Sequence, residues 1–412
     1  MRVVAFACCL AFGATPALAQ RADLPPAEKV NEALDSHPSV AAALARIEAA
    51  RARGDMLRKG PHEVTVSGSY IRRTVDREGG FDEFDTTISR PFRLPGKAAL
   101  DRKAGALGIE VAENQMEDVR HQTALILSSL WHDWLTAGTH YRNDMDTVRG
   151  LEESIAAVKR RVALRDAAQL DLDQAQAALA QARAQAASSL SIREQARVTL
   201  AAAFPDIPLP SEPPELASPT LPDVGLETMR DLVIERSHEI RAADKEAQRL
   251  GVTAQRVRAD RIADPSFGVR LFSERGGMEK GAGIVASIPL GGGYRRAAAD
   301  QASAEANAAR MELAAIQRNI QAIANADLSN ARTRYDAWRN ADLSMHSAAD
   351  AAAKMARGYQ LGQIDLTDLL YVRRQAQEAH RLEIDARSEA DRALLNLQID
   401  SHSIWAPDEE KR

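Results

Sequence analysis

Landmark residues recur along this 412-residue chain at an offset of about 200 positions, and this repeat constrains the fold more than any other feature. An offset this long is typical of the duplication of a whole supersecondary unit, whereas solenoid arrays repeat at much shorter periods. Three pairs of segments carry it: Ser36-His37 with Ser237-His238, Ser89-Arg90-Pro91 with Ser287-Ile288-Pro289, and Leu170-Asp171-Leu172 with Thr367-Asp368-Leu369.

A proline-rich stretch separates the two halves. Seven of the seventeen prolines lie between positions 205 and 222, and because proline fixes φ and removes a hydrogen-bond donor, this stretch is expected to be an extended connector. The sequence therefore predicts a first repeat over 20–204, a linker over 205–225, a second repeat over 226–406 and a tail over 407–412.

Each half predicts a helix, two strands, a very long helix, a tight turn and another helix. Apolar and polar residues alternate over 64–70, 84–89, 267–272 and 282–288, which is the pattern of a strand with one lipid-facing and one lumen-facing side. Charged loops over 72–80 and 273–280 are expected to be the hairpin tips. Four strands cannot close a barrel alone, so a membrane role requires oligomerisation; a small soluble sheet with one wet face is the alternative.

No proline interrupts 97–166 or 295–360, and a helix of that length reaches roughly 100 Å at about 1.5 Å per residue. Apolar residues at alternating spacings of three and four predict coiled-coil packing, with alanines allowing close approach of the helices. The seam positions in the first half are Val148, Leu151, Ile155, Val158 and Val162, and after the turn Leu172, Ala175, Leu179, Ala182 and Ala186.

The first nineteen residues resemble a secretory signal peptide, with Arg2, a short apolar run and Ala17-Leu18-Ala19 as the cleavage site. Cys8 and Cys9 both lie in this segment, so the mature chain is expected to hold no disulfide, thiolate metal site or cysteine nucleophile. Lipidation at one of these cysteines is the disfavoured alternative, because the apolar segment before Cys8 is very short.

No enzyme, cofactor or metal site is expected. His121, His132 and His140 lie more than about 10 Å apart along one predicted helix, so they cannot share an ion and are expected to be surface or interface residues. Gly291-Gly292-Gly293 lacks the lysine of a phosphate-binding loop and is interpreted as a turn. The net charge is −5 and acidic and basic residues are interspersed, so the sequence has no basic patch of the kind that binds nucleic acid.

The signal peptide, the duplication, the two strands per half and the long hairpins together resemble the TolC family of outer-membrane efflux proteins over essentially the whole mature chain. Its most specific motif is the hairpin turn, with an aromatic residue or Arg, a Gly, and an Asp six residues after that Gly. Tyr359, Gly362 and Asp368 match it in the second half. In the first half Arg161 and Asp171 match, but Arg165 takes the place of the glycine, which leaves the geometry of that turn open.

The resemblance implies a mainly α fold with a membrane β-barrel portion: a homotrimer with a twelve-stranded barrel in outer-membrane lipid and a tunnel of coiled-coil helices in the periplasm. It also implies a periplasmic adaptor (membrane fusion protein) and an inner-membrane pump, expected to be of the RND type. Asp368 and Asp171 would lie at the periplasmic aperture, where carboxylates favour cations. The tip residues Arg161, Arg165, Tyr359 and Gly362 would contact the adaptor. A solvated acid at a helix N-terminus is the plainer role for Asp368.

Residues 90–97 further resemble the CzcC-like heavy-metal efflux branch, although Ala98 replaces the last basic residue of its Gly-Lys-Arg signature. This segment is expected to fix the bend from strand to helix rather than to bind metal. The predicted function is thus passive conduction of solutes, with heavy-metal cations as one candidate cargo. The alternatives are a periplasmic adaptor, a structural coiled-coil protein, or the channel of a type I secretion or multidrug efflux system.

Overall fold

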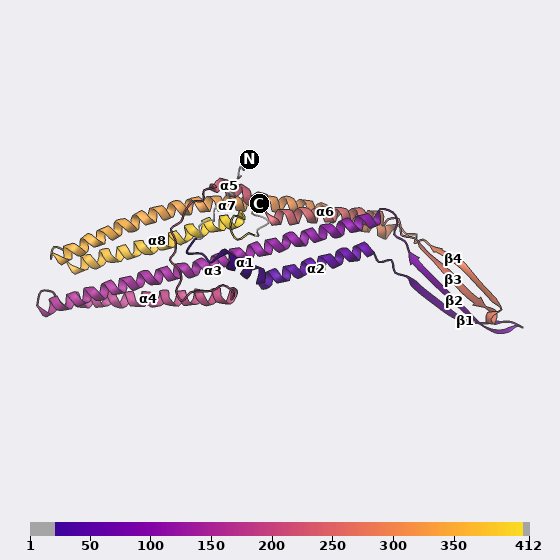
Figure 1. Cartoon of the computed structure of the whole chain (residues 1–412), viewed down its shortest axis with the longest axis horizontal. Coiled ribbons are helices and arrows are strands. Elements are labelled where there is room, and N and C mark those ends of the chain that lie inside the picture. The colour runs from indigo at the N-terminus through magenta and orange to yellow at the C-terminus, as the bar shows by residue number, and fades with distance from the viewer. Residues whose placement is uncertain (1–20, 407–412) are drawn as a thin grey trace, which may run out of the picture.

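The computed structural model describes residues 21–406, which form a long rod of helices with a β-sheet at one end (Figure 1). The expected signal peptide, 1–19, and tail, 407–412, lie outside the described residues. Two helices, two strands, a long helix and a shorter helix follow one another, and the same order then occurs again. The first set is α1 (Ala27–Ser36), α2 (Pro38–Lys59), β1 (Thr65–Val75), β2 (Gly79–Pro91), α3 (Lys97–Ala163) and α4 (Gln169–Ala203). The second set is α5 (Leu226–Arg236), α6 (His238–Ala259), β3 (Ser266–Glu274), β4 (Glu279–Ser287), α7 (Gly293–Gln360) and α8 (Leu366–Asp400), with the short 3₁₀ turn η1 (Arg275–Gly277) between β3 and β4.

The two longest helices span most of the rod. α3 has 67 residues and α7 has 68, which at about 1.5 Å per residue corresponds to roughly 100 Å each. Both begin and end within three residues of the predicted stretches, because the absence of proline lets the backbone hydrogen bonds continue without interruption. None of the described helices combines the length and apolar character needed to cross a membrane.

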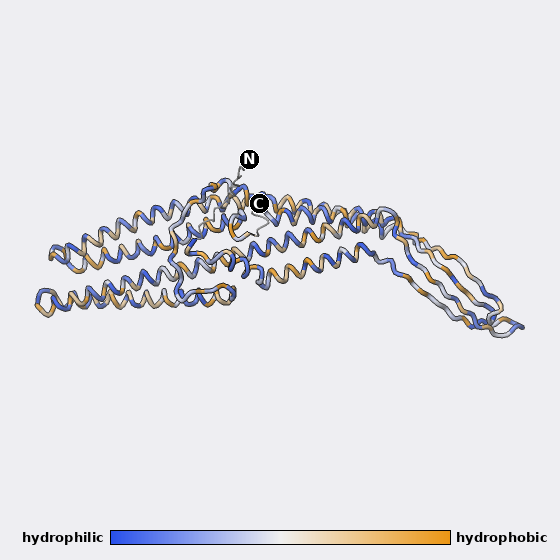
Figure 2. The backbone as a smooth tube through the Cα atoms, viewed as in Figure 1, coloured by the Kyte–Doolittle hydropathy of each residue, from blue (hydrophilic) through white to orange (hydrophobic). Residues whose placement is uncertain are grey.

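The helices form a wall that is one helix thick. Near the sheet, α3 packs between α2 and α6, and α6 packs against α7; toward the hairpin turns, α3 lies between α4 and α8, and α8 packs against α7. The long helices therefore have their helical neighbours mainly at their sides, while the short helices α1 and α5 and the linker pack over the middle of the wall. The consequence is visible in Figure 2, where apolar and polar positions alternate along every helix and no long segment is uniformly apolar.

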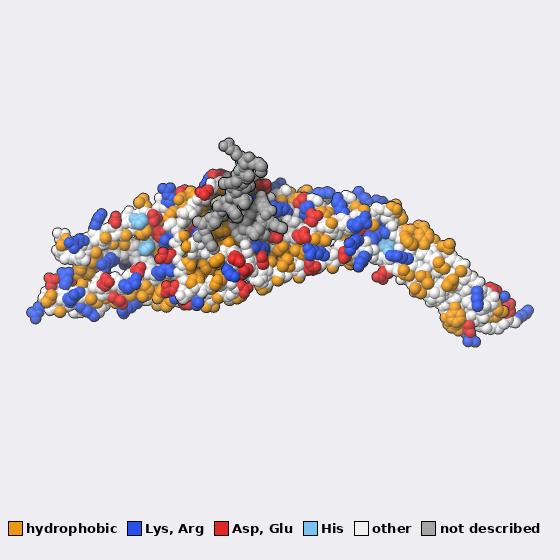
Figure 3. Space-filling view, viewed as in Figure 1, with side chains coloured by type: hydrophobic (Ala, Val, Ile, Leu, Met, Phe, Trp, Pro, Cys, Tyr) orange, Lys and Arg blue, Asp and Glu red, His pale blue; other side chains and the backbone are white. Residues whose placement is uncertain are grey.

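The four strands form one antiparallel sheet in the order β1-β2-β3-β4, so the two halves join through β2 and β3. The predicted alternation is confirmed by the register. Val66, Ile88, Val269 and Ile284 lie opposite one another in a row across all four strands, and each is about half exposed or more. On the other side, the neighbouring row holds Ser67, Thr87, Arg270 and Gly283. Hydrophobic side chains are prominent where the sheet adjoins the helices (Figure 3).

The first hairpin is tighter than the sequence predicts. The charged segment 72–80 was expected to be a loop, but β1 continues to Val75 and β2 begins at Gly79. Cross-strand pairs explain the difference, because Arg73 Nη2 lies 2.7 Å from Glu83 Oε1 and the Tyr70 hydroxyl donates to Asp82 at 2.7 Å. The charged residues at this end therefore belong to the paired strands and not to a loop.

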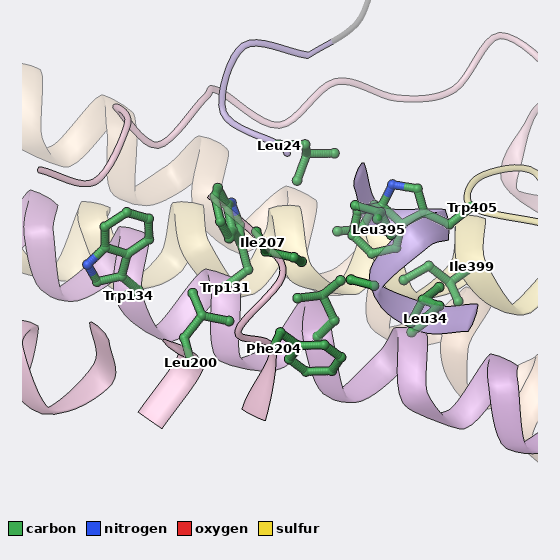
Figure 4. Packing of buried hydrophobic residues seen from close by; sticks show 14 of the residues in the cluster. Leu24, Leu34, Trp131, Trp134, Leu200, Phe204, Ile207, Leu395, Ile399 and Trp405 are labelled. Atoms are coloured by element: carbon green, nitrogen blue, oxygen red, sulfur yellow. The ribbon is translucent and has the colours of Figure 1, made fainter. Parts of the chain in front are cut away.

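The main apolar core lies at the middle of the rod (Figure 4). Trp131 and Trp134 of α3 meet edge to face with ring centroids 5.3 Å apart, and the Trp131 indole donates to the carbonyl of Asp23 at 2.8 Å. These side chains pack against α1, the end of α4, the linker, α8 and the segment after it. The labelled members of this cluster are Leu24, Leu34, Trp131, Trp134, Leu200, Phe204, Ile207, Leu395, Ile399 and Trp405.

The linker between the halves contains no helix or strand and lies against α3. Gly138 allows this approach, because a Cβ at that position would lie 2.0 Å from Pro213 Cγ. Arg142 donates from Nη1 to the Pro213 carbonyl at 2.8 Å. Ile207 and Leu216 of the linker are themselves part of the core, so the connector is packed down along its length.

A buried ionic cluster fixes the bend between wall and sheet. Lys97, at the start of α3, is only 2% exposed, and its Nζ lies 2.8 Å from both Asp260 Oδ1 and Asp264 Oδ1. Burial opposes ionisation of Asp264, but hydrogen bonds from Lys97, the Leu94 amide and His62 lower its pKa to about 2. Residues of the strand-to-helix segment 90–97 are thus engaged in contacts with Asp260 and Asp264 of the same chain.

Replacing Lys97 by Met should therefore destabilise the protein by about 3 kcal/mol, because removing one partner of a buried ion pair leaves the carboxylates uncompensated. Thermal and denaturant unfolding in detergent would measure the loss. Lys103→Met is the matched control, since Lys103 lies exposed on the same helix. Equal unfolding temperatures for the two variants would contradict the assigned role of the cluster.

Candidate functional site: the wall groove and the hairpin tips

One face of the helical wall carries a groove of about 870 Å³, which we call the wall groove. It forms where α4, α3, α8 and α7 lie side by side, between the middle of the rod and the hairpin turns. The two inner helices, α3 and α8, form its floor, and the two outer helices, α4 and α7, form its sides. Most of the residues that line it have polar or charged side chains. Its ionisable residues are Asp133 and His140 of α3, Asp327 and Arg334 of α7, and Asp385, Glu389 and Arg392 of α8.

The wall groove lies on the face that the linker leaves open. Along α3, Ala137 and His140 line the groove, whereas Gly138 and Arg142 contact the linker. At 100° per residue these two pairs point to nearly opposite sides of the helix. The wall therefore has one covered side and one open, polar side.

Ion pairs across the floor and one side of the groove join neighbouring helices. Arg392 Nη2 lies 2.5 Å from Asp133 Oδ1, and His140 Nε2 lies 2.7 Å from Asp385 Oδ1, so both connect α3 with α8. Arg334 pairs with Glu389 between α7 and α8. Four carboxyl groups face two guanidinium groups and one imidazole in the lining, and this excess of acidic groups favours cations over anions in the groove.

The two hairpin turns have the same backbone geometry despite their different sequences. Arg165 has φ 61° and Gly362 has φ 71°. In the first turn the Asp166 amide donates to the Arg161 carbonyl at 2.8 Å, and in the second the Gln363 amide donates to the Gly358 carbonyl at 3.0 Å. The arginine thus adopts the left-handed conformation that glycine adopts at little cost.

The tips also touch each other. The Arg161 guanidinium lies 5.1 Å from the centre of the Tyr359 ring and 2.8 Å from Asp166 Oδ2. Apolar side chains of both hairpins, Ile155, Val158 and Leu369 among them, pack just behind the turns. Arg161, Arg165, Tyr359 and Gly362 are therefore brought together at one end of the rod.

The two acids proposed for the aperture differ in their local roles. The Asp171 carboxylate accepts the Ala168 amide at 3.2 Å and so stabilises the start of α4. Asp368 is exposed in the first turn of α8, where its amide donates to the Asp365 carboxylate at 2.8 Å. Within residues 21–406 we find no hydrogen bond or ion pair from the Asp368 carboxylate itself. Of the two, Asp368 is the one whose charge is available.

The histidines of α3 are not isolated surface groups. His121, His132 and His140 each face an aspartate of α8, at Nε2–Oδ distances of 2.9 Å to Asp400, 3.0 Å to Asp391 and 2.7 Å to Asp385. His132 is fully buried, and Arg21 lies 2.6 Å from the same Asp391 oxygen. In the part of the chain that the structure describes, no three His, Asp or Glu side chains are placed to hold a metal ion.

Arg165→Gly should stabilise the protein by about 1 kcal/mol, because a non-glycine residue in the left-handed region costs roughly that much. Gly362→Ala is the reciprocal variant and should lose a similar amount. Denaturant unfolding of both variants measures the difference. A destabilised Arg165→Gly variant would show that contacts of the arginine side chain outweigh the backbone cost.

Comparison with solved structures gives several similar chains. The outer-membrane channel OprN shares 19% sequence identity with this chain, and the likeness covers 92% of this chain and 91% of that one with a TM-score of 0.78. CusC, whose structures concern transmembrane channel formation, gives 16% identity, 91% coverage of both chains and a TM-score of 0.74. The open state of the Neisseria gonorrhoeae outer-membrane channel MtrE gives 17% identity, coverage of 91% and 88%, and a TM-score of 0.71.

No protein-family model matches the chain, and neither does any curated protein. At these identities the likeness establishes the fold. The chain has a TolC-like channel fold, with long coiled-coil helices and a four-stranded sheet.

Proposed function

We propose that this chain is one protomer of a trimeric outer-membrane channel that passively conducts solutes out of the cell. The observation that carries the proposal is the wall groove, an open face lined mostly by polar residues, which is formed by four helices that lie side by side in the wall. Three such walls, set edge to edge, would enclose a tunnel lined by their groove faces. No chemical step is needed for this function.

The sheet supports the same assembly. Its row of Val66, Ile88, Val269 and Ile284 gives it an apolar side, and its row of Ser67, Thr87 and Arg270 gives it a polar side. Such a sheet suits a barrel wall between lipid and a water-filled lumen. β1 and β4 are the edges of the sheet, and pairing of β4 with β1 of the next protomer would close twelve strands from three copies.

The location of the helices, the domain division and the partners are proposed from this placement of the sheet in a barrel. The barrel would lie in outer-membrane lipid and the helices in the periplasm, after removal of a signal peptide over 1–19. The domain division at 20–204, 205–225 and 226–406 is proposed on the same basis. The hairpin tips, with Arg161, Arg165, Tyr359 and Gly362, would meet a periplasmic adaptor and through it an inner-membrane pump, for which we propose the RND type.

The excess of carboxylates in the wall groove favours cationic cargo, and heavy-metal cations of the CzcC-like branch are one class that fits. A periplasmic adaptor or a structural coiled-coil protein would leave the two-sided sheet and the open groove unexplained. Channels for type I secretion or multidrug efflux share the same architecture and differ in cargo.

The function can be tested by placing a cysteine in the tunnel. Gln195→Cys lies in the wall groove, and a charged thiol reagent should lower the conductance of this variant in planar bilayers. Glu212→Cys, at an exposed position of the linker on the other side of the wall, is the control and should not respond. The purified particle should have the mass of a trimer and fractionate with the outer membrane. A soluble periplasmic monomer, or a Gln195→Cys variant that is labelled without loss of conductance, would refute the proposal.

Asp368→Asn should reduce the preference of the channel for cations, because it removes one exposed charge per protomer at the aperture. The reversal potential in a salt gradient measures the change. Glu28→Gln, an exposed charge on α1 outside the groove, is the matched control. If the reversal potentials of wild type and Asp368→Asn coincide, the aperture assignment is wrong, while the channel itself is unaffected.

A further inference from the structure

Near the middle of the rod, the two halves of the chain meet in a cluster of ionisable groups. His121 of α3 pairs with Asp400 at the end of α8, and the Asp400 carboxyl is hydrogen-bonded to the carboxyl of Asp327 on α7. One contact therefore links three helices from both halves. Protonation of Asp327 favours this contact, because two ionised carboxylates would repel each other.

Further titratable groups lie around His121. The His121 ring lies 5.3 Å from the ring of His402, which in turn stacks on His238 of α6 at 4.8 Å. Asp118 of α3 and Glu239 of α6 both act electrostatically on His121. Glu117 and Arg120 line the same small pocket as His121, His238 and His402. The cluster lies where α8 ends and α6 begins. At this point the neighbour of α3 in the wall changes from α8 to α6.

From this arrangement we propose that the contact of His121, Asp400 and Asp327 is a proton-controlled joint, which holds α3, α7 and α8 together when protonated and loosens when it loses its protons. Asp327 lines the wall groove, so its carboxyl exchanges protons with water in the groove. The proposal concerns the chain itself and does not depend on what passes along the groove.

The direction of the effect follows from the electrostatics. Burial, together with the charge of Asp400, raises the pKa of Asp327 from 3.8 to about 7. A folded-state pKa above the unfolded value means that the stabilisation is complete below pH 3.8 and is lost as the pH rises toward 7. Burial disfavours the imidazolium of His121, but Asp400 outweighs it and raises the pKa of His121. Its stabilisation is likewise lost on the alkaline side.

The test is the pH dependence of thermal unfolding of the purified full-length protein in detergent. The melting temperature of wild type should fall between about pH 5.5 and about pH 8.5, and Asp327→Asn should lose more than half of that fall. At the alkaline end Asp327→Asn should melt above wild type. Asp336→Asn, an exposed acid on the same helix, is the matched control and should retain the wild-type slope.

Hydrogen exchange adds a local readout that a general change of stability would not reproduce. Protection factors, which correct for the general acceleration of exchange with pH, should fall around 325–330 and 397–402 at alkaline pH in wild type, but not in Asp327→Asn. Asp400→Asn serves if the first variant fails to fold, since removing the partner carboxylate should also flatten the slope of the melting temperature with pH. A wild-type slope in Asp327→Asn, or a loss of protection that is uniform along α7 and α8, would overturn the proposal.

Discussion

The lateral contact between the two halves is the constraint on which the rest of the structure depends. It begins as the hydrogen-bonded ladder of β2 with β3, continues as α3 against α6 and ends as α3 against α8. Because the wall is one helix thick, no second layer supports this line. Its chemistry therefore determines whether the two halves behave as a single wall.

That chemistry changes along the rod. Backbone hydrogen bonds hold the sheet, and the buried pairs of Lys97 hold the bend. Where α3 meets α8, polar pairs accompany the apolar core, with His132 facing Asp391 and Asp144 accepting from Arg381 at 2.8 Å. A separate apolar cluster lies behind the hairpin turns. Polar contacts specify one register of α3 against α8 but contribute little net stability.

Much of the fold could be predicted from the sequence, because it follows from local patterns. The alternation around Val66 and Ile284 gave the strands, and proline-free stretches gave α3 and α7. The tips were found through their turn motif, although Arg165 seemed to break it; the structure shows that a backbone of fixed hydrogen bonds can hold even arginine at φ 61°.

The pairing of α3 with α8 could not be predicted in this way. His121, His132 and His140 stood out in the sequence, but their partners lie about 250 to 280 positions later, among many other aspartates. These residues meet only because α3 and α8 pack side by side with a particular axial register and a particular rotation about each helix axis. The wall groove was missed for the same reason, since it has no motif and arises from four helices side by side.

The anchoring of Arg21 also has a consequence for how the chain acquires its structure. Arg21 bonds to Asp391, 370 positions away, and the Trp131 indole bonds to the carbonyl of Asp23. Synthesis proceeds from the N-terminus, so Asp23 can meet Trp131 early, whereas Arg21 waits for almost the entire chain before Asp391 exists. Contacts of such long sequence separation are slow to form and leave intermediates with exposed apolar surface. The middle of the wall is thus the last part to close, and the chain must be kept from aggregating until its final helix arrives.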